Sequence, residues 1–251
     1  MDVVLLGSGN VATQLGRALV EAGHRIKQVY SRTEGHAQAL AATVGAEATN
    51  DLTTIDVQAD VYIIAVKDDA LAAVAAQLPT TLQGTVVHTA GSVDMAVLSE
   101  HAADYGVLYP LQTFSKAKVV DFSTIPIAIE ASGEAVLLKL EALAGTLSKC
   151  VFRCDSKQRL SLHVAAVFAC NFTNHFYAIA ADILQEHGLE FDFIRPLILE
   201  TAQKVMEHQP QEVQTGPAAR NDVRTMGKHL ELLETNPVLA QLYRLISKQI
   251  R

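Results

Sequence analysis

The residues best suited to hold a phosphorylated cofactor stand near the start of the chain, in the segment Gly7-Ser8-Gly9-Asn10-Val11-Ala12. This segment has the form G-x-G-x-x-A: the first glycine permits a tight turn, the second lets a pyrophosphate approach, and the small last residue lets helix and strand pack closely. It follows an apolar run and opens an amphipathic helix, whose free N–H groups and positive dipole end attract phosphate. Two glycines in a surface turn are the plain alternative. The context predicts a dinucleotide-binding loop with cofactor contacts from Gly7 to Val11.

The residues expected to select the cofactor are Ser31, Arg32 and Thr33, at the end of the second predicted strand. Sites for NAD usually place an aspartate or glutamate there to bind the ribose hydroxyls, and here the first carboxylate is Glu34. Arg32 can pair with a 2′-phosphate and stack on adenine, and the two hydroxyls can donate hydrogen bonds. An ordinary surface arginine is the alternative. The pattern favours NADP(H) over NAD(H).

Two more groups of small and polar residues follow predicted strands, namely Ala65, Val66 and Lys67, and Thr89 and Ala90. Ligands of open α/β sheets bind at the carboxyl ends of the strands. We therefore expect these five residues to line the cofactor site. Asp68 and Asp69 come next, and one of them is expected to cap the following helix.

A long predicted helix carries polar residues on an otherwise apolar surface, among them His163 and Asn171. Eight residues are about two helical turns, so these two fall on roughly the same face. Reduction by a nicotinamide requires a group that delivers a proton, and histidine does this near neutral pH. We therefore predict His163 and Asn171 as catalytic candidates. Alternatively, the polar residues contact a second subunit or local backbone.

Three further residues are candidates for binding a substrate: Gln112, Thr113 and Arg220. The first two follow a predicted strand, although a plain turn is the alternative. Arg220 follows a Gly-Pro turn and could hold a carboxylate with two hydrogen bonds, or pair with Asp222. Asn221 is expected to cap the next helix, and His229 is a second candidate expected near Asp222.

The elements that must position these residues are short apolar runs separated by helical patterns. Strands are predicted at residues 3–6, 26–30, 61–66, 85–88, 106–109, 125–130 and 150–153, with helices at 10–22, 35–43, 69–78 and 134–147. Strand–helix alternation with continuously apolar strands predicts a doubly wound, mostly parallel sheet. Beyond residue 155 only helices are predicted, at 157–187, 193–208, 221–234 and from Asn236. The expected fold class is α/β: a Rossmann domain over 1–153 and an all-α domain over 154–251.

The composition excludes several classes of protein. Of 251 residues, 49% are hydrophobic and 19% charged, which indicates a packed globular chain. A net charge of −7 argues against nucleic acid as a partner. No uninterrupted apolar run reaches the roughly 20 residues of a membrane span, and the first residues lack a basic signal-peptide region, so a cytoplasmic protein is expected. Cys150, Cys154 and Cys170 are expected to be core residues, and no motif suggests a metal site.

Three segments resemble a known family. The segments Tyr109-Pro110-Leu111-Gln112-Thr113-Phe114 and Thr215-Gly216-Pro217-Ala218-Ala219-Arg220-Asn221-Asp222 look like signatures of the Rossmann-like/DUF2520 family, and residues 163–171 are similar to its first C-terminal helix. The N-terminal half resembles F420-dependent NADP oxidoreductases, pyrroline-5-carboxylate reductases, and the 6-phosphogluconate and β-hydroxyacid dehydrogenases. The resemblance implies a nucleotide-binding domain followed by a helical domain, like that of 6-phosphogluconate dehydrogenase, which commonly mediates dimerisation.

Two positions depart from the proteins that the chain resembles. Related sequences often have histidine where this one has Tyr109, so an acid–base role at that position is not carried over. The dehydrogenases often place a lysine one turn before an asparagine, but here Val167 stands four residues before Asn171, so the lysine mechanism is not carried over either.

These observations together predict an NADP(H)-dependent oxidoreductase. It would act on a small carbonyl or imine compound at a cleft between the carboxyl edge of the sheet and the helical domain. The alternative is a protein that binds or senses NADP(H) without turnover. Because the long apolar helix would expose too much surface by itself, a homodimer built through the C-terminal helices is expected.

Overall fold

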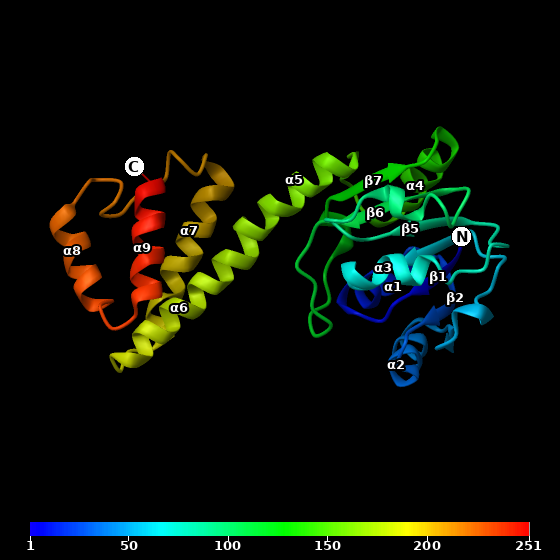
Figure 1. The fold of residues 1–251 in the computed structure, drawn as a ribbon, viewed down its shortest axis with the longest axis horizontal. Helices are drawn as coiled ribbons and strands as arrows, with labels where there is room; N and C mark the ends of the chain where they lie inside the picture. Colours follow the sequence, from blue (N-terminus) through cyan, green and yellow to red (C-terminus); the bar gives the residue numbers. More distant parts are fainter. Residues whose placement is uncertain (251) are drawn as a thin grey trace. The chain divides into compact units, whose positions relative to one another are not determined.

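The computed structural model describes residues 1–250, which form two compact units (Figure 1). The first unit is Met1–Asn174, and the second contains the described residues from His175 onward. The strands are β1 Asp2–Leu6, β2 Arg25–Tyr30, β3 Glu47–Thr49, β4 Val61–Ile64, β5 Thr85–His88, β6 Tyr105–Pro110, β7 Ile127–Ala131 and β8 Val151–Arg153. The helices are α1 Asn10–Glu21, α2 Glu34–Val44, α3 Asp68–Ala75, α4 Glu134–Leu147, α5 Ser156–Ala166, α6 Thr173–Glu186, α7 Arg195–Glu207, α8 Val223–Leu232 and α9 Pro237–Gln249.

The eight strands form one sheet in the order β3-β2-β1-β4-β5-β6-β7-β8. All neighbouring pairs are parallel except β6 and β7. The order of the first five strands is that of a Rossmann fold, so the predicted fold class is confirmed. Because β1 pairs with both β2 and β4, the winding reverses there, and ligands of such sheets bind beyond the carboxyl ends of these strands.

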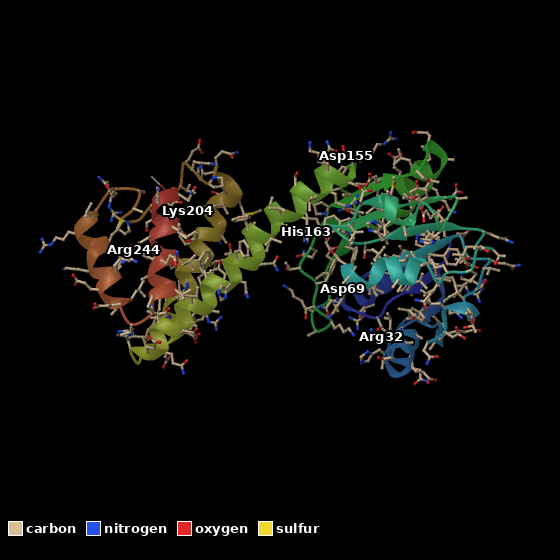
Figure 2. All side chains as sticks on the ribbon, in the orientation of Figure 1. Arg32, Asp69, Asp155, His163, Lys204 and Arg244 are labelled. Atoms are coloured by element: carbon tan, nitrogen blue, oxygen red, sulfur yellow. The ribbon has the colours of Figure 1, made fainter. Side chains whose placement is uncertain are left out.

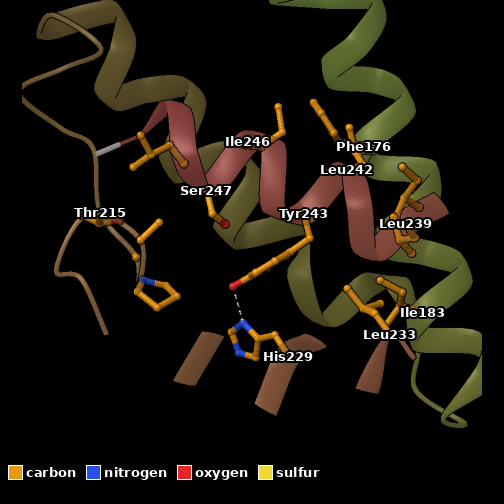
Figure 3. A pocket seen from close by; sticks show the side chains of 15 residues that line it. Phe176, Ile183, Thr215, His229, Leu233, Leu239, Leu242, Tyr243, Ile246 and Ser247 are labelled. Carbon is orange, nitrogen blue, oxygen red and sulfur yellow. Dashed lines mark hydrogen bonds between the residues drawn. The ribbon is translucent and has the colours of Figure 1, made fainter. Parts of the chain in front are cut away.

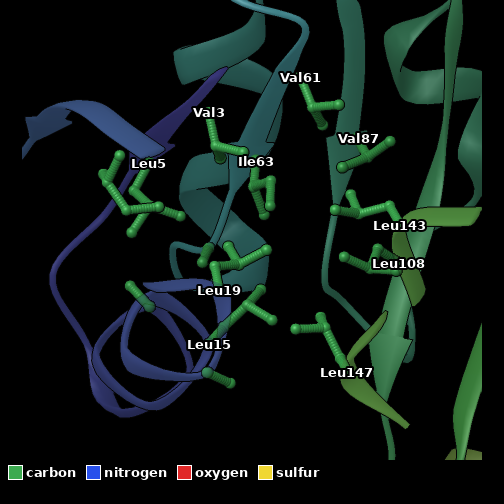
Figure 4. Packing of buried hydrophobic residues seen from close by; sticks show 14 of the residues in the cluster. Val3, Leu5, Leu15, Leu19, Val61, Ile63, Val87, Leu108, Leu143 and Leu147 are labelled. Carbon is green, nitrogen blue, oxygen red and sulfur yellow. The ribbon is translucent and has the colours of Figure 1, made fainter. Parts of the chain in front are cut away.

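The core lies on both faces of the sheet, because successive side chains of a strand point in opposite directions. Val3 and Leu5 belong to the cluster packed under α1, α2 and α4, whereas Val4 and Leu6 belong to the cluster packed under α3. Figure 4 shows part of the first cluster, with residues of β1, α1 and α4 labelled. All four are fully buried, so the strand is a continuous apolar run. Gly16 allows α1 to approach closely, since a Cβ there would lie 2.9 Å from Leu5 Cδ1.

The helical stretch after β8 differs from the single long helix that was expected. It consists of α5, a π-helical segment at Val167–Phe172, and α6. By length and composition alone, the 31 residues Ser156–Glu186 could cross a membrane, and the most apolar part of the stretch is not buried within this chain. The sequence contains no uninterrupted apolar run over this stretch, because polar residues such as His163 and Asn171 lie within it. The predicted domain division at residue 153 stays a prediction.

Two predictions about the local structure are wrong. Asp222, rather than Asn221, caps α8: its Oδ1 atom accepts from the Thr225 N–H at 3.0 Å, while Asn221 has a left-handed backbone with φ of 53°. Asparagine tolerates that conformation better than most residues. Of the three cysteines only Cys154 is buried, because Cys150 lies in the turn before β8 and Cys170 on the uncovered π-helical segment.

Candidate cofactor and active site

The glycine loop has the geometry that a diphosphate requires. Gly7 has φ of +133°, and a Cβ there would lie 2.2 Å from the Ala65 carbonyl oxygen, so only glycine fits against β4. Gly9 precedes α1, and a Cβ built on it would meet no atom within 4 Å. No side chain caps the first N–H groups of α1, and its first turn contains no acidic residue. The open space, free N–H groups and helix dipole fit the diphosphate of a dinucleotide.

The end of β2 presents the residues predicted to select the cofactor. The hydroxyl of Ser8, in the glycine loop, donates to the hydroxyl of Ser31 at 2.9 Å, which ties the two loops together. Arg32 is exposed, lies at the N-terminal end of α2 (Figure 2), and forms no ion pair within the described residues. Thr33 precedes α2 without a side-chain cap. The guanidinium of Arg32 is therefore available to a 2′-phosphate.

The end of β4 lies beside the end of β1 and the glycine loop, and the end of β5 lies beside that of β4. The Ala65 N–H bonds to the Leu6 carbonyl at 2.8 Å, and the Thr89 N–H bonds to the Ile64 carbonyl at 3.2 Å. The expected capping role of Asp68 or Asp69 is wrong: Lys67 stands at the N-cap of α3 without a side-chain cap bond. Both aspartates lie inside the first turn of α3, where the helix dipole stabilises a carboxylate. Asp68 also accepts a hydrogen bond from the Ser92 hydroxyl.

The loop after β6 is tied to the start of α1. Asn10 Nδ2 donates to the Phe114 carbonyl at 2.9 Å, and Gln14 Nε2 donates to the Ser115 and Lys118 carbonyls at 2.5 and 2.7 Å. These bonds bring Gln112 and Thr113 to the edge of the sheet that carries the glycine loop. The two residues are exposed, and Gln112 Oε1 accepts from the Thr113 N–H at 2.8 Å. Their role in substrate binding stays a prediction.

A tyrosine–histidine pair lies at the same edge of the sheet. The Tyr109 hydroxyl and His163 Nδ1 are 3.1 Å apart, and the two rings meet edge to face with centroids 6.2 Å apart. Gly91 makes room for the pair, because a Cβ there would lie 2.6 Å from His163 Nδ1 and 2.9 Å from Tyr109 Cζ. Burial raises the pKa of Tyr109, and the negative charge of Asp68 acts in the same direction while Arg159 opposes it. Tyr109 therefore stays protonated at neutral pH.

A second histidine beneath this pair is neutral. His88, the last residue of β5, is fully buried, and its Nδ1 accepts from the Ala90 N–H at 3.1 Å. Its Nε2 is buried without a hydrogen-bond partner among the described residues. Burial, followed by the positive charge of Arg159, lowers the pKa of His88 to about 4. This bond orders the segment that carries Gly91, and the residue itself cannot exchange protons near pH 7.

Asn171, the second catalytic candidate, is not brought into this pair. It is exposed and lies in the π-helical segment, and the structure gives its side chain no hydrogen bond within the described residues. The wider π-helical turn also alters the periodicity on which the shared face with His163 was predicted. Segments of this kind occur frequently at functional sites, but a catalytic role for Asn171 stays a prediction.

Two further candidates, Arg220 and His229, lie in the second unit. Arg220 is exposed and forms no ion pair with Asp222, whose pKa is lowered first by the Thr225 N–H, then by the Thr225 hydroxyl, with a contribution from the charge of Arg220. His229 Nδ1 lies 2.8 Å from the Tyr243 hydroxyl in a largely apolar cavity of about 340 Å³ (Figure 3). Residues 1–250 contain no cluster of three or more side chains suited to a metal ion.

These features define a dinucleotide-binding protein of the oxidoreductase type. Residues 125–250 match the model described as a domain of unknown function, DUF2520, and residues 2–91 match the model described as NADP oxidoreductase, coenzyme F420-dependent. The chain belongs to the DUF2520 family, whose model matches half of it, and its residues 2–91 match the NADP oxidoreductase model. These matches confirm the predicted family and the predicted cofactor, NADP(H).

Solved structures support the family and the fold. A Bacteroides fragilis protein provisionally assigned as an NADP oxidoreductase is 48% identical, with a TM-score of 0.90 and coverage of 99% of this chain and 97% of that one. An imine reductase from Myxococcus stipitatus in complex with NADP+ has 18% identity, a TM-score of 0.70, and coverage of 100% and 93%. A reductive aminase from Aspergillus terreus in complex with NADPH and ethyl levulinate has 16% identity, a TM-score of 0.74, and coverage of 100% and 93%. No curated protein matches this sequence.

Proposed function

We propose that the protein catalyses reduction or oxidation of a small carbonyl or imine compound with NADP(H), at the carboxyl edge of its sheet. The observation that carries this proposal is the Tyr109–His163 pair, which packs on Gly91 beside the strand ends that form the cofactor site. The fold shared with an imine reductase and a reductive aminase supports a C=N or C=O substrate. Gln112 and Thr113, tied to the glycine loop through the segment that follows them, are the proposed substrate contacts.

The residues of the first unit divide the work as follows. The N–H groups at the start of α1 hold the diphosphate, and Arg32 binds the 2′-phosphate. The bound cofactor supplies or accepts the hydride. Reduction leaves an electron pair on the oxygen or nitrogen of the substrate, which must then receive a proton. Because Tyr109 stays protonated, its hydroxyl can donate to His163 Nδ1, which places the imidazole proton on Nε2. Loss of that proton from a neutral ring would leave an anion, so the proposed proton donor is the ring protonated on both nitrogens. In that form Nδ1–H donates to the Tyr109 hydroxyl oxygen, Nε2–H gives its proton to the substrate, and a neutral ring remains.

The test is a screen of NADPH consumption against cyclic imines, ketones with ammonia, and simple ketones. We expect turnover with at least one class, and a loss in kcat of about 100-fold or more in His163→Asn. The affinity for NADPH should stay within about twofold in that variant, because the side chain acts only on the substrate. Tight binding of NADPH with no turnover across the panel would favour a binding or sensing protein instead. Equal turnover by both proteins would exclude His163 as the donor.

We further propose that the exposed apolar surface of the C-terminal helices is covered by a second copy of the chain. Phe168, Phe193 and Leu197 are 64%, 67% and 65% exposed in one chain, far more than is usual for such residues in a soluble monomer. A membrane is less suited to cover this surface than a second chain. The reason is that α5, which forms the first third of the apolar stretch, is hydrogen-bonded to Tyr109 of the sheet through His163. We infer a cytoplasmic homodimer on this basis.

Sedimentation equilibrium should give twice the chain mass of 27.0 kDa. Phe168→Glu should shift the protein toward monomer, whereas the same change at exposed Val119, in the loop after β6, should leave the mass unchanged. The proposal would be contradicted if the wild-type protein floated with lipid vesicles. It would also be contradicted if the wild-type protein sedimented as a stable monomer.

A further inference from the structure

A buried arginine joins three parts of the first unit beneath the Tyr109–His163 pair. Arg159 on α5 is only 1% exposed, and its guanidinium forms an ion pair with Glu130 of β7. Its second terminal nitrogen donates to the Val93 carbonyl at 2.6 Å and to the Ser156 hydroxyl at 3.1 Å. Val93 lies in the segment after β5 that also carries Gly91. One side chain therefore links α5, β7 and this segment.

The start of α5 is fixed by the same group of bonds. Glu130 accepts from the Ser156 N–H at 3.0 Å and from the Ser156 hydroxyl at 2.8 Å, and the Ser156 hydroxyl oxygen accepts from the Met95 N–H at 3.1 Å. A capping box closes the first turn, in which Asp155, labelled in Figure 2, and Gln158 accept each other's backbone N–H groups at 2.7 and 3.0 Å. The origin and rotation of α5 about its own axis are thus set at its first turn.

His163 lies four residues after Arg159, which is about one turn further along the same face of α5. Any rotation of the helix about its axis would move His163 relative to Tyr109 and Gly91. We infer that Arg159 is a positioning residue, which holds α5 at the rotation that places His163 Nδ1 against the Tyr109 hydroxyl. This inference rests on the proposed function for its catalytic meaning, although the geometry it concerns exists without a substrate.

Stability alone does not account for a buried guanidinium at this position. Burying an ion pair is costly, and a well-packed apolar side chain of similar size is often as stable or more so. Arg159 also leaves its Nε atom without a partner among the described residues. What the guanidinium provides is a rigid, planar set of donors that reaches acceptors on three elements at defined angles. Fixing the orientation of α5 is the property that an apolar residue would not supply.

The test compares the wild-type chain with Arg159→Met, which keeps most of the volume but loses the donors and the charge. Arg153→Met is the matched control, because Arg153 pairs with Glu141 on the exposed surface at the end of β8. The readout is the long-range ¹H–¹⁵N spectrum of the histidine rings, with the signals of His163 assigned by their loss in His163→Asn. In the wild-type and control proteins we expect one tautomer of His163 with a hydrogen-bonded Nδ1. In Arg159→Met we expect averaged tautomers.

Glu130→Gln provides a second variant that keeps the shape and some hydrogen bonds of the partner, and it should have an intermediate effect. In the turnover assay Arg159→Met should lower kcat by at least about tenfold with NADPH affinity within about twofold. Because the histidine ring spectrum is recorded without substrate, absence of turnover would refute the proposed function but would not bear on this inference. Unchanged His163 signals in a folded Arg159→Met protein would overturn the inference. Failure of both Arg159→Met and Glu130→Gln to fold would also overturn it, because Arg159 would then be required for stability.

Discussion

The choice between NADPH and NADH should depend chiefly on one exposed side chain, Arg32. Arg32 lies between β2 and α2, next in sequence to Ser31, and no carboxylate of the described residues pairs with it. Replacing it by alanine removes the positive charge and the paired donors while leaving the backbone of the glycine loop unaltered. The change should therefore weaken chiefly the binding of the 2′-phosphate, since any stacking of the guanidinium on adenine is lost for both dinucleotides alike.

The expected magnitude lies between two limits. A single exposed ion pair contributes about 0.5 kcal/mol, because solvent and salt screen it, whereas a hydrogen bond to a charged group contributes about 1.5–3 kcal/mol. A doubly charged phosphate bound by two parallel N–H groups approaches the second value even at a partly solvated site. We take about 2 kcal/mol, which corresponds to about a 30-fold increase in the Kd for NADPH. The Kd for NADH, which lacks this phosphate, should change by less than about twofold.

The assay is a titration of each dinucleotide by calorimetry at 0.05 and 0.5 M salt. The wild-type affinity for NADPH should fall more steeply with salt than that of Arg32→Ala, because the variant has lost the screened contact. Arg25→Ala is the control, because Arg25 is also exposed but begins β2, at the opposite end of the same strand. The reasoning is refuted if Arg32→Ala weakens both dinucleotides equally, or if the control variant has the same effect.

Three further predictions concern the glycines and His88. Gly91→Ala should displace His163, lower kcat by about tenfold or more, and cost about 1–3 kcal/mol of unfolding free energy, measured by chemical denaturation. The control is Gly145→Ala at an exposed position of α4, which should instead stabilise the protein by up to about 1 kcal/mol. Gly7→Ala should abolish NADPH binding in the same titration, and retention of binding would contradict the tight approach to β4. Because the pKa of His88 is lowered to about 4 in the folded chain, the unfolded chain binds the extra proton between about pH 6.5 and 4. Unfolding free energy should therefore fall by about 3 kcal/mol as pH drops through that window, and His88→Asn should show a shallower slope.

Much of the sheet could be predicted from the sequence because its strands are buried on both faces. Such strands are continuous apolar runs, as in Val3 to Leu6, and their boundaries were predicted within a few residues. The strand β3 could not be found this way, since Glu47 and Ala48 are exposed and the strand pairs only along the edge of the sheet. The π-helical segment was also missed, because a one-residue change in hydrogen-bond register leaves no mark in composition.

The glycine loop was predictable from the sequence, and the Tyr109–His163 pair was not. The glycine loop is contiguous, and each residue has its own steric requirement, so spacing alone indicates it. The Tyr109–His163 bond joins residues 54 positions apart, and neither residue indicates the other in the sequence. Arg159 was not predicted to be part of the site for another reason. Arginine is almost never fully buried, so an arginine in a helix is ordinarily interpreted as a surface residue. A usable signal was present in the spacing of Ser156, Arg159 and His163, which all fall on one face of α5.

Burial and hydrogen bonding distinguish the two histidines of the candidate site. Protonating His88 would place a second positive charge near Arg159 in a fully buried position, and its lowered pKa expresses that cost. The His163 ring is only half-buried, and its Nδ1 faces the Tyr109 hydroxyl, which can either donate or accept a hydrogen bond. In the proposed reaction the Tyr109–His163 pair would therefore exchange the proton, while neutral His88 keeps the segment bearing Gly91 in place. The same reasoning requires that His88→Asn, which preserves an acceptor for the Ala90 N–H, should retain most of the turnover that His163→Asn abolishes.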